Sequence, residues 1–257
     1  MSYGDDFDPY APPQTDVTAS KKTGNFGSAA NFTLSDVLSR SWQIMRSRMG
    51  LTIAMVVVYF VLANLMSAIA GSINNQVVKL LLTLANLVLS VFFQVGLFTY
   101  LLNLASGREA GFKDLFSGGP LILPVFFASL VFGLVIFGAL IPAGILAIVL
   151  PPIGIIVALV YGVIAYIYIF TRLSQFYYLL IDREVGIMES LKLSSQLMKG
   201  REIQFLGLTL MLGLLNFAGA LAFLVGLLIT VPLSLLCLAV YYLGITGQPV
   251  ADPLAIE

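Results

Sequence analysis

The sequence predicts an all-α fold: a polytopic membrane bundle of about six transmembrane helices, with two amphipathic helices on the cytoplasmic side. Of the 257 residues, 59% are hydrophobic and only 10% are charged, whereas a soluble domain carries about 25% charged residues. Apolar runs of roughly 20 residues, the length that crosses a bilayer, recur along the chain. Two charged stretches share a pattern and each precedes a pair of apolar runs, which predicts a partial internal repeat.

The chain divides by composition into residues 1–32, 33–246 and 247–257. The first region is rich in Pro, Gly, Ser, Thr and Asp and shows no periodicity. We expect a disordered cytoplasmic tail there, because it offers too little apolar surface to offset the entropy of ordering. This tail either solubilises the protein or docks a partner through Tyr3, Phe7 and Tyr10. Residues 33–246 are the six-span membrane domain, and residues 247–257 are a polar cytoplasmic tail.

Thr33 to Met49 is the first predicted surface helix. Thr33 and Asp36 have the spacing of a capping box, and Asp36 favours the positive end of the helix. At about 100° per residue, one side of the helix is apolar: Leu34, Val37, Leu38, Trp42, Met45 and Met49. With Arg40, Arg46 and Arg48 able to reach the headgroups, the pattern indicates a helix in the membrane interface.

Leu51 to Ala70 and Val77 to Asn103 are the first two predicted spans, joined by a short turn. Within the second span, polar residues three or four positions apart share one face: Thr83, Asn86, Ser90 and Gln94. Polar side chains in hydrocarbon seek partners, so we expect these residues, with Asn64 and Asn216, to form interhelical hydrogen bonds. The alternative is a polar path or a ligand site on this face.

A short polar segment follows, with an amphipathic piece around Phe112 to Phe116. Leu121 to Val149 is the third span, and Pro142 is expected to kink it or end it early. Pro151 and Pro152 force a turn. Ile153 to Ile181 is the fourth span, and it is expected to tilt or protrude because it is longer than a bilayer requires.

The second surface helix covers roughly Gly186 to Lys199. Its charged face is narrow and contains Glu189, Lys192, Gln196 and Lys199, with Ile187, Met188, Leu191, Ser194 and Met198 opposite or flanking. Ile203 to Gly226 and Leu227 to Thr246 are the fifth and sixth spans and form a tight hairpin. Small residues spaced four apart in the fifth span, Ala218, Ala222 and Gly226, predict close helix packing.

Basic residues set the predicted topology. The chain has 13 Lys and Arg residues, and all except Lys79 lie before the first span, between spans two and three, or around the loop from four to five. Cytoplasmic loops carry such an excess of Lys and Arg. The sequence therefore predicts a protein integral to the cytoplasmic (inner) membrane, with both termini in the cytoplasm and an even number of spans.

The internal repeat is visible in the two surface stretches. Asp36–Arg48 matches Glu189–Arg201 in the pattern acid-x-Leu-x-x-Ser-x-Gln-Ile/Leu-Met-basic-x-Arg. Each copy precedes a pair of spans that starts from the cytoplasm. This suggests a duplicated unit of parallel orientation, made of one surface helix and one transmembrane hairpin.

Three stretches, Leu34–Gly50, Tyr177–Arg201 and Gly226–Tyr242, carry a resemblance to a group of bacterial six-span proteins. The group includes the YciC-like proteins and the membrane domain of some glycerophosphodiester phosphodiesterases, and the resemblance covers roughly Phe32 to Thr246. It implies a membrane bundle with cytoplasmic amphipathic helices and no established activity. In the fused members catalysis lies in a separate soluble barrel domain. This sequence has no counterpart of that domain, so we expect no phosphodiesterase activity.

The remaining composition argues against an enzyme. The chain has no histidine, the commonest general base and metal ligand, and Cys237 lies in an apolar run that suits an inert core thiol. We therefore expect no catalysis and no cofactor. Because the net charge is zero, we expect no nucleic-acid partner.

The expected partners are the lipid bilayer, including anionic lipids, and a protein partner or second copy bound through the tail or the surface helices. Lipid contacts are expected at Arg40, Trp42, Arg46, Arg48, Arg172, Lys192, Lys199 and Arg201. The favoured interpretation is a non-catalytic structural, membrane-organising or accessory subunit. The alternative is a carrier or channel for a neutral or lipidic solute.

The topology predicts the location of reporter fusions. Fusions at Asn74 or Pro152 should be extracytoplasmic, and fusions at Gly111 or Gly186 should be cytoplasmic, because the positive loops stay inside. A paired alkaline phosphatase and green fluorescent protein assay measures both sides. The opposite pattern at all four positions would overturn the orientation.

Overall fold

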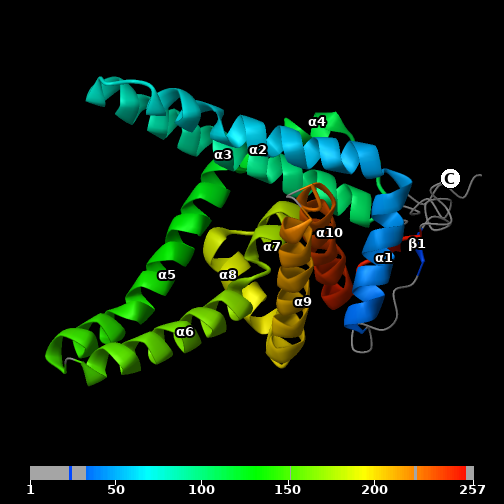
Figure 1. Ribbon diagram of the computed structural model, residues 1–257. Coiled ribbons are helices and arrows are strands. Elements are labelled where there is room, and N and C mark those ends of the chain that lie inside the picture. The colour runs from blue at the N-terminus through cyan, green and yellow to red at the C-terminus, as the bar shows by residue number, and fades with distance from the viewer. Residues whose placement is uncertain (1–22, 25–32, 151, 223–224, 253–257) are drawn as a thin grey trace, which may run out of the picture.

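The computed structural model describes residues 23–24, 33–150, 152–222 and 225–252, and its all-α architecture confirms the predicted fold class (Figure 1). The predicted tail, apart from Thr23 and Gly24, lies outside the described residues. In chain order the elements are β1 (Thr23–Gly24), α1 (Leu34–Ser47), α2 (Met49–Gly71), α3 (Gln76–Ala105), α4 (Phe112–Leu115), the 3-10 helix η2 (Gly119–Leu121), α5 (Ile122–Val149), α6 (Ile153–Leu173), α7 (Phe176–Arg183), α8 (Ile187–Leu197), α9 (Glu202–Leu221), α10 (Leu227–Thr246) and β2 (Val250–Ala251).

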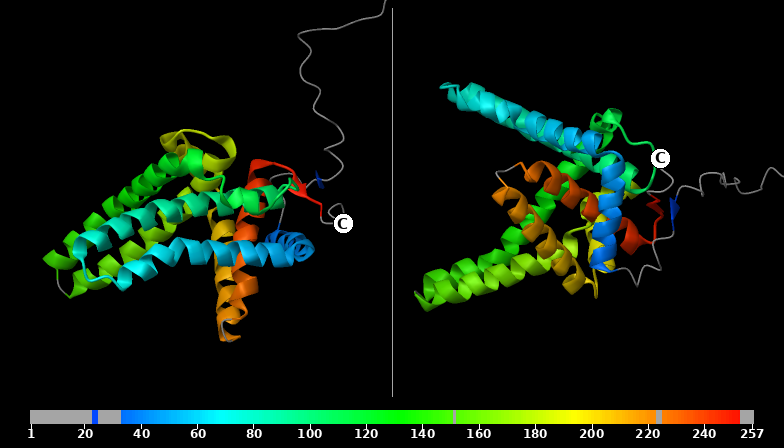
Figure 2. Two further views of the ribbon diagram at one scale, coloured as in Figure 1. Left: turned by 90° about the horizontal axis from the view of Figure 1, so that it is seen from above. Right: turned by 45° about the vertical axis from the view of Figure 1, so that its right-hand side comes forward.

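Three antiparallel hairpins form the body of the protein: α2–α3, α5–α6 and α9–α10. They supply six stretches, among the described residues, that are long and apolar enough to cross a membrane. The hairpins diverge from a common base, and α9–α10 runs in a different direction from the other two (Figure 2). We use "the base" for α1, α4, α7, α8 and the segment Gly247–Asp252, which lie where the hairpins meet.

The short base helices pack in a cyclic order. Each precedes one hairpin along the chain but packs on the hairpin before it: α4 packs on α2–α3, and α8 packs on α5–α6 and α7. The first helix, α1, completes the cycle by packing mainly on α10 of the last hairpin. The three units, each a hairpin with the short helix that packs on it, therefore form a ring. The contact of α1 with α10 closes this ring.

A glycine makes one of these contacts possible. A Cβ atom at Gly96 in α3 would collide with the backbone carbonyl of Leu115 in α4. Only a residue without a side chain allows the two backbones to approach so closely. The sequence GFKDLF (111–116) thus forms a short base helix in direct contact with the first hairpin.

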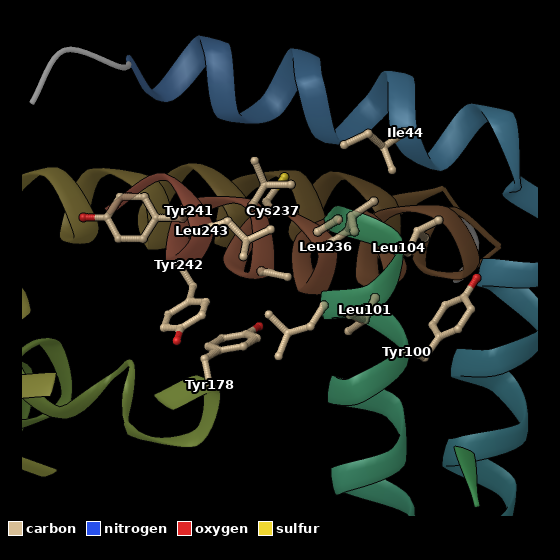
Figure 3. Packing of buried hydrophobic residues seen from close by; sticks show 14 of the residues in the cluster. Ile44, Tyr100, Leu101, Leu104, Tyr178, Leu236, Cys237, Tyr241, Tyr242 and Leu243 are labelled. Carbon is tan, nitrogen blue, oxygen red and sulfur yellow. The ribbon is translucent and has the colours of Figure 1, made fainter. Parts of the chain in front are cut away.

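The hydrophobic core lies at the base, around α10. Residues 232–234, 236–237 and 239–245 of this helix are buried, and 67% of its apolar stretch is inside the protein. Ile44 of α1, Leu101 of α3 and Tyr178 of α7 converge on it (Figure 3). The last helix of the chain is therefore the element on which the others assemble.

The two described ends of the chain lie together. Thr23 and Gly24 pair antiparallel with Ala251 and Val250, and Val250 and Ala251 are fully buried. Val250 and Ala251, within the polar tail predicted for residues 247–257, are consequently part of the core. The pairing also puts both described ends on one side, as an even number of spans requires.

The fourth predicted span is broken, which corrects the expectation of one continuous helix from Ile153 to Ile181. Helix α6 ends at Leu173, and α7 starts at Phe176. Ser174 and Gln175 form the break. The predicted span therefore contains a bend, and its tilt or protrusion relative to the membrane stays a prediction.

Pro142 lies inside α5, which continues to Val149, so the proline does not end that span early. Helix α9 ends at Leu221, earlier than the predicted Gly226. Ala222 caps α9 and Gly226 caps the start of α10. The predicted ridge of Ala218, Ala222 and Gly226 on one helix is therefore wrong.

The predicted capping box at the start of α1 is confirmed. Thr33 Oγ1 accepts from the Asp36 N–H, and the Asp36 carboxylate accepts from the Thr33 hydroxyl at 2.6 Å and its N–H at 2.8 Å. The hydroxyl first, and the N–H second, hold the pKa of Asp36 below its ordinary value. The ionised cap therefore stabilises α1 above that ordinary pKa, and its contribution is lost as the pH falls through the lowered value.

Candidate functional site

A single carboxylate joins three parts of the base. Oδ2 of Asp182, at the end of α7, accepts from the Tyr242 hydroxyl of α10 at 2.8 Å and from the Gln248 amide at 2.6 Å. Hydrogen bonds to a charged acceptor are stronger than those between neutral groups. Asp182 thus holds α7, α10 and the C-terminal segment together.

Aromatic packing continues from this carboxylate into the core. The ring of Tyr178 stacks on Tyr242 with centroids 5.2 Å apart, and it meets Phe98 of α3 edge-on at 5.1 Å. Each such pair adds about 0.5–1.5 kcal/mol beyond its buried area. Tyr178 therefore contacts an aromatic residue of the first hairpin and one of the third. Figure 3 shows Tyr178 beside Tyr242.

Four of the arginines predicted to contact lipid donate to backbone carbonyls of the protein. Arg40 Nε bonds the carbonyl of Ala251 at 3.1 Å, and Arg48 bonds that of Ala110 at 3.1 Å. Arg172 bonds the carbonyl of Ser195 at 2.9 Å, and Arg201 bonds that of Ile245 at 3.1 Å. Two of these carbonyls, those of Ser195 and Ile245, lie in the last turn of a helix, where intrahelical donors run out.

The repeat is visible in these contacts. Ser41 and Ser194 occupy equivalent positions and are both fully buried, as are Met45 and Met198. Arg48 and Arg201 are the last residues of the shared pattern. Each donates to a carbonyl near the second helix of the hairpin that follows it: Arg48 to Ala110, after α3, and Arg201 to Ile245, in the last turn of α10. The matching sequences therefore specify matching contacts.

The break between α6 and α7 is held by a cluster of polar groups. The Ser194 hydroxyl of α8 accepts from the Gln175 N–H and donates to the Arg172 carbonyl, each at 3.1 Å. The Arg172 guanidinium also lies 3.2 Å from a Glu202 carboxylate oxygen and 5.5 Å from the Tyr168 ring centroid. Sequence reasoning missed this cluster because its members come from three helices.

The other predicted interface residues are exposed at the base. Trp42 is 37% exposed, and Arg46, Lys192 and Lys199 are also exposed. Trp42 was expected on the apolar side of α1, but the buried side is formed by Val37, Ser41, Ile44 and Met45. Met188 of α8, 69% exposed, likewise lies outside the packed face. Lipid contact of these side chains stays a prediction.

Three of the six polar residues expected to link helices bond within their own helix. Asn64 donates to the carbonyl of Phe60, Thr83 to that of Lys79 and Ser90 to that of Leu87. The interhelical expectation is therefore wrong for these three residues. It is confirmed for Asn216, whose amide donates to the Ser234 hydroxyl of α10 at 3.0 Å.

For Asn86 and Gln94 the interhelical hydrogen bond stays a prediction. Both are partly buried on α3, and the Asn86 side-chain oxygen is buried without a hydrogen-bond partner. The interhelical bonds that sequence reasoning missed involve tyrosine hydroxyls: Thr52 with Tyr100 at 3.0 Å, and Ser129 with Tyr177 at 2.6 Å. Their partners are 48 residues apart, so no local spacing could have indicated them.

Close packing of the last hairpin comes from a different pair of small residues. A Cβ atom on Gly226 would lie 2.6 Å from the carbonyl oxygen of Gly219. These two glycines let α9 and α10 approach at their turn, whereas Ala218 and Ala222 are exposed. The prediction of small-residue packing therefore applies to Gly226 with a partner that it did not name.

The described residues contain no group of three or more His, Cys, Asp and Glu side chains that could hold a metal ion. Cys237 is fully buried. The chemistry of the base is thus hydrogen bonding and ion pairing among side chains and helix ends. No protein-family model, no curated protein and no solved structure matches the chain.

The hydrogen bonds to the Asp182 carboxylate predict a specific loss of stability when this residue is replaced. Asp182→Ala should destabilise the protein by about 1–3 kcal/mol, because the Tyr242 hydroxyl and the Gln248 amide lose their charged acceptor in a partly buried site. Asp182→Asn should cost less, since an amide oxygen still accepts. Thermal unfolding in detergent, followed by tryptophan fluorescence, measures the difference.

Glu109→Ala is the matched control, because its carboxylate pairs with Lys113 at a highly exposed position and exposed pairs contribute little. Equal unfolding temperatures for Asp182→Ala and Glu109→Ala would show that the hydrogen bonds to Asp182 do not stabilise the base.

Proposed function

We propose that the protein is a non-catalytic structural, membrane-organising or accessory subunit of the bacterial inner membrane. The observation that carries this proposal is where the charged residues lie and what they contact. In the described residues of the long apolar helices α2, α3, α5, α6, α9 and α10, Asp, Glu, Lys and Arg lie within four residues of a helix end. At the base, Arg40, Arg48, Arg172, Arg201 and Asp182 bond other parts of the protein.

Such an arrangement suits an anchor more than a pump. Proteins that move ions or protons keep ionisable groups at membrane depth, along the path of the substrate. The middles of the three hairpins contain no Asp, Glu, Lys or Arg among the described residues. Arg172 of α6 and Glu202 of α9 instead form an ion pair at the base from which the hairpins diverge.

The surface of the base supplies the contacts for organisation. Trp42 with Arg46 on α1, and Met188 with Lys192 on α8, each place an apolar side chain and a basic one four positions apart, both exposed. Basic residues beside apolar anchors bind the anionic headgroups of the cytoplasmic leaflet. The resemblance to the YciC-like proteins, which carries no established catalytic activity, is consistent with this role.

The alternative function, a carrier or channel for a neutral or lipidic solute, uses the Asn86 and Gln94 face of α3. The buried Asn86 oxygen without a hydrogen-bond partner is the observation that favours it. A solute hydroxyl or amide could supply the missing donor.

Reconstitution distinguishes the two functions. Purified protein in liposomes of inner-membrane lipid should release no trapped ions, sugars or amino acids above protein-free liposomes, and it should not accelerate lipid scrambling. Copurification from native nanodiscs should recover a defined membrane complex, or clusters of this protein enriched in anionic lipid. Solute flux that disappears in Asn86→Leu and Gln94→Leu, but survives in Ser67→Leu on the exposed side of α2, would establish the carrier and overturn the proposal.

A further inference from the structure

The second hairpin is attached to the rest of the protein at one end only. Just 6% of the apolar stretch of Ile153–Arg183 and 11% of that of Phe112–Val149 are buried, against 67% for Leu227–Thr246. In Figure 1, α5–α6 runs away from the base in a direction of its own. Its position is therefore set by the contacts at the base end of α5 and α6.

The link between α6 and α7 needs only a small rotation to straighten. Ser174 has φ −58° and ψ −27°, and Gln175 has φ −96° and ψ 0°. These values lie near the helical region, and Gln175 ψ is the one furthest from the helical value of about −42°. The break is thus a bend between two helices rather than an extended loop.

Ser194 of α8 occupies the backbone groups that a straight helix would pair. In a continuous helix, the Gln175 N–H would donate to the Thr171 carbonyl, and the Arg172 carbonyl would accept from the Phe176 N–H. Instead, the Ser194 hydroxyl accepts from the Gln175 N–H and donates to the Arg172 carbonyl. The Ser174 hydroxyl donates to the Thr171 carbonyl at 3.0 Å. Two serine hydroxyls therefore replace the missing helical bonds.

Arg172 adds a second attachment. Its guanidinium bonds the Ser195 carbonyl in the last turns of α8 and pairs with Glu202 at the start of α9. The two side chains are only 20% and 27% exposed, so solvent screens the pair less than it screens an exposed one. Arg172 thus ties the base end of α6 to both following helices.

We propose that α5–α6 is a movable arm, with its pivot at Ser174–Gln175, and that Ser194 and the Arg172–Glu202 pair lock it in the bent position. The bent state also leaves a buried group without a partner. Gln175 is 1% exposed, and its side-chain oxygen accepts no hydrogen bond. A buried acceptor left unpaired disfavours the state that contains it. The lock opposes this cost, and its release lets α6 and α7 become collinear and moves the arm relative to α2–α3.

Distances between two spin labels, measured by electron paramagnetic resonance, test the movement of the arm in the whole protein in liposomes. Spin labels go on Ile148→Cys, at the far end of α5, and Val77→Cys, at the far end of α3; these side chains are 81% and 66% exposed. The native Cys237 is fully buried and stays unlabelled. With the lock intact, one distance population is expected. Ser194→Ala and Arg172→Gln should each give a shifted or second population.

Two control variants remove comparable groups away from the pivot: Ser39→Ala on the exposed side of α1, and Lys113→Gln in the exposed pair with Glu109. Both should keep the parent distribution. If Arg172→Gln does not fold, Glu202→Gln removes the ion pair and leaves the bond from Arg172 to Ser195, with the same expected shift. An unchanged distribution in both Ser194→Ala and the folded ion-pair variant, or an equal change in the controls, would overturn the proposal.

Discussion

A helix must satisfy the carbonyl groups of its last turn, and a helix end that is buried by its neighbours has no water to do so. At the base of this protein the donors are arginine guanidinium groups and serine hydroxyls from neighbouring helices. Arg172 and Arg201 each reach a carbonyl in the last turn of a helix, and Arg48 reaches the Ala110 carbonyl in the segment between α3 and α4. The Ser194 hydroxyl donates to the Arg172 carbonyl at the interrupted end of α6. Each of these bonds joins two elements, so satisfying the helix ends also assembles the base. Arginines whose positions in the sequence predict the membrane orientation therefore stabilise the fold as well.

The same bonds account for the cyclic arrangement of the three units. Each short helix sits on the hairpin before it, and the last step of the cycle brings α1 onto α10 across most of the chain length. Arg40 and the pairing of β1 with β2 attach the C-terminal segment beside this closure. With their bases fixed, the hairpins can differ in how they extend into the membrane. The sparsely buried α5–α6 hairpin is the one whose attachment depends most on a few polar groups.

The sequence predicted what local chemistry determines. Apolar length placed α10 at Leu227–Thr246 without error, and the Thr33–Asp36 spacing identified the cap of α1, because both features depend on residues near in the chain. The buried side of α1 was partly misassigned, since α10 covers Ser41 and Ile44 and leaves Trp42 outside. Asn216 was identified as a linking residue, but the partner Ser234 was not. The break in the fourth span could not be predicted, because the Ser194 hydroxyl that replaces its helical bonds comes from another helix.

Closure of the ring by α1 is the central claim, and one disulfide tests it directly. The Ser41 hydroxyl lies beside the Cys237 thiol of α10, and both side chains are fully buried. Ser41→Cys in native membranes, treated with copper phenanthroline, should form an intrachain disulfide with Cys237, seen as faster migration in a non-reducing gel after cysteine blocking. Trp42→Cys, one position further and facing outward, should not. Absence of the Ser41→Cys disulfide, or equal crosslinking from position 42, would contradict the packing of α1 on α10.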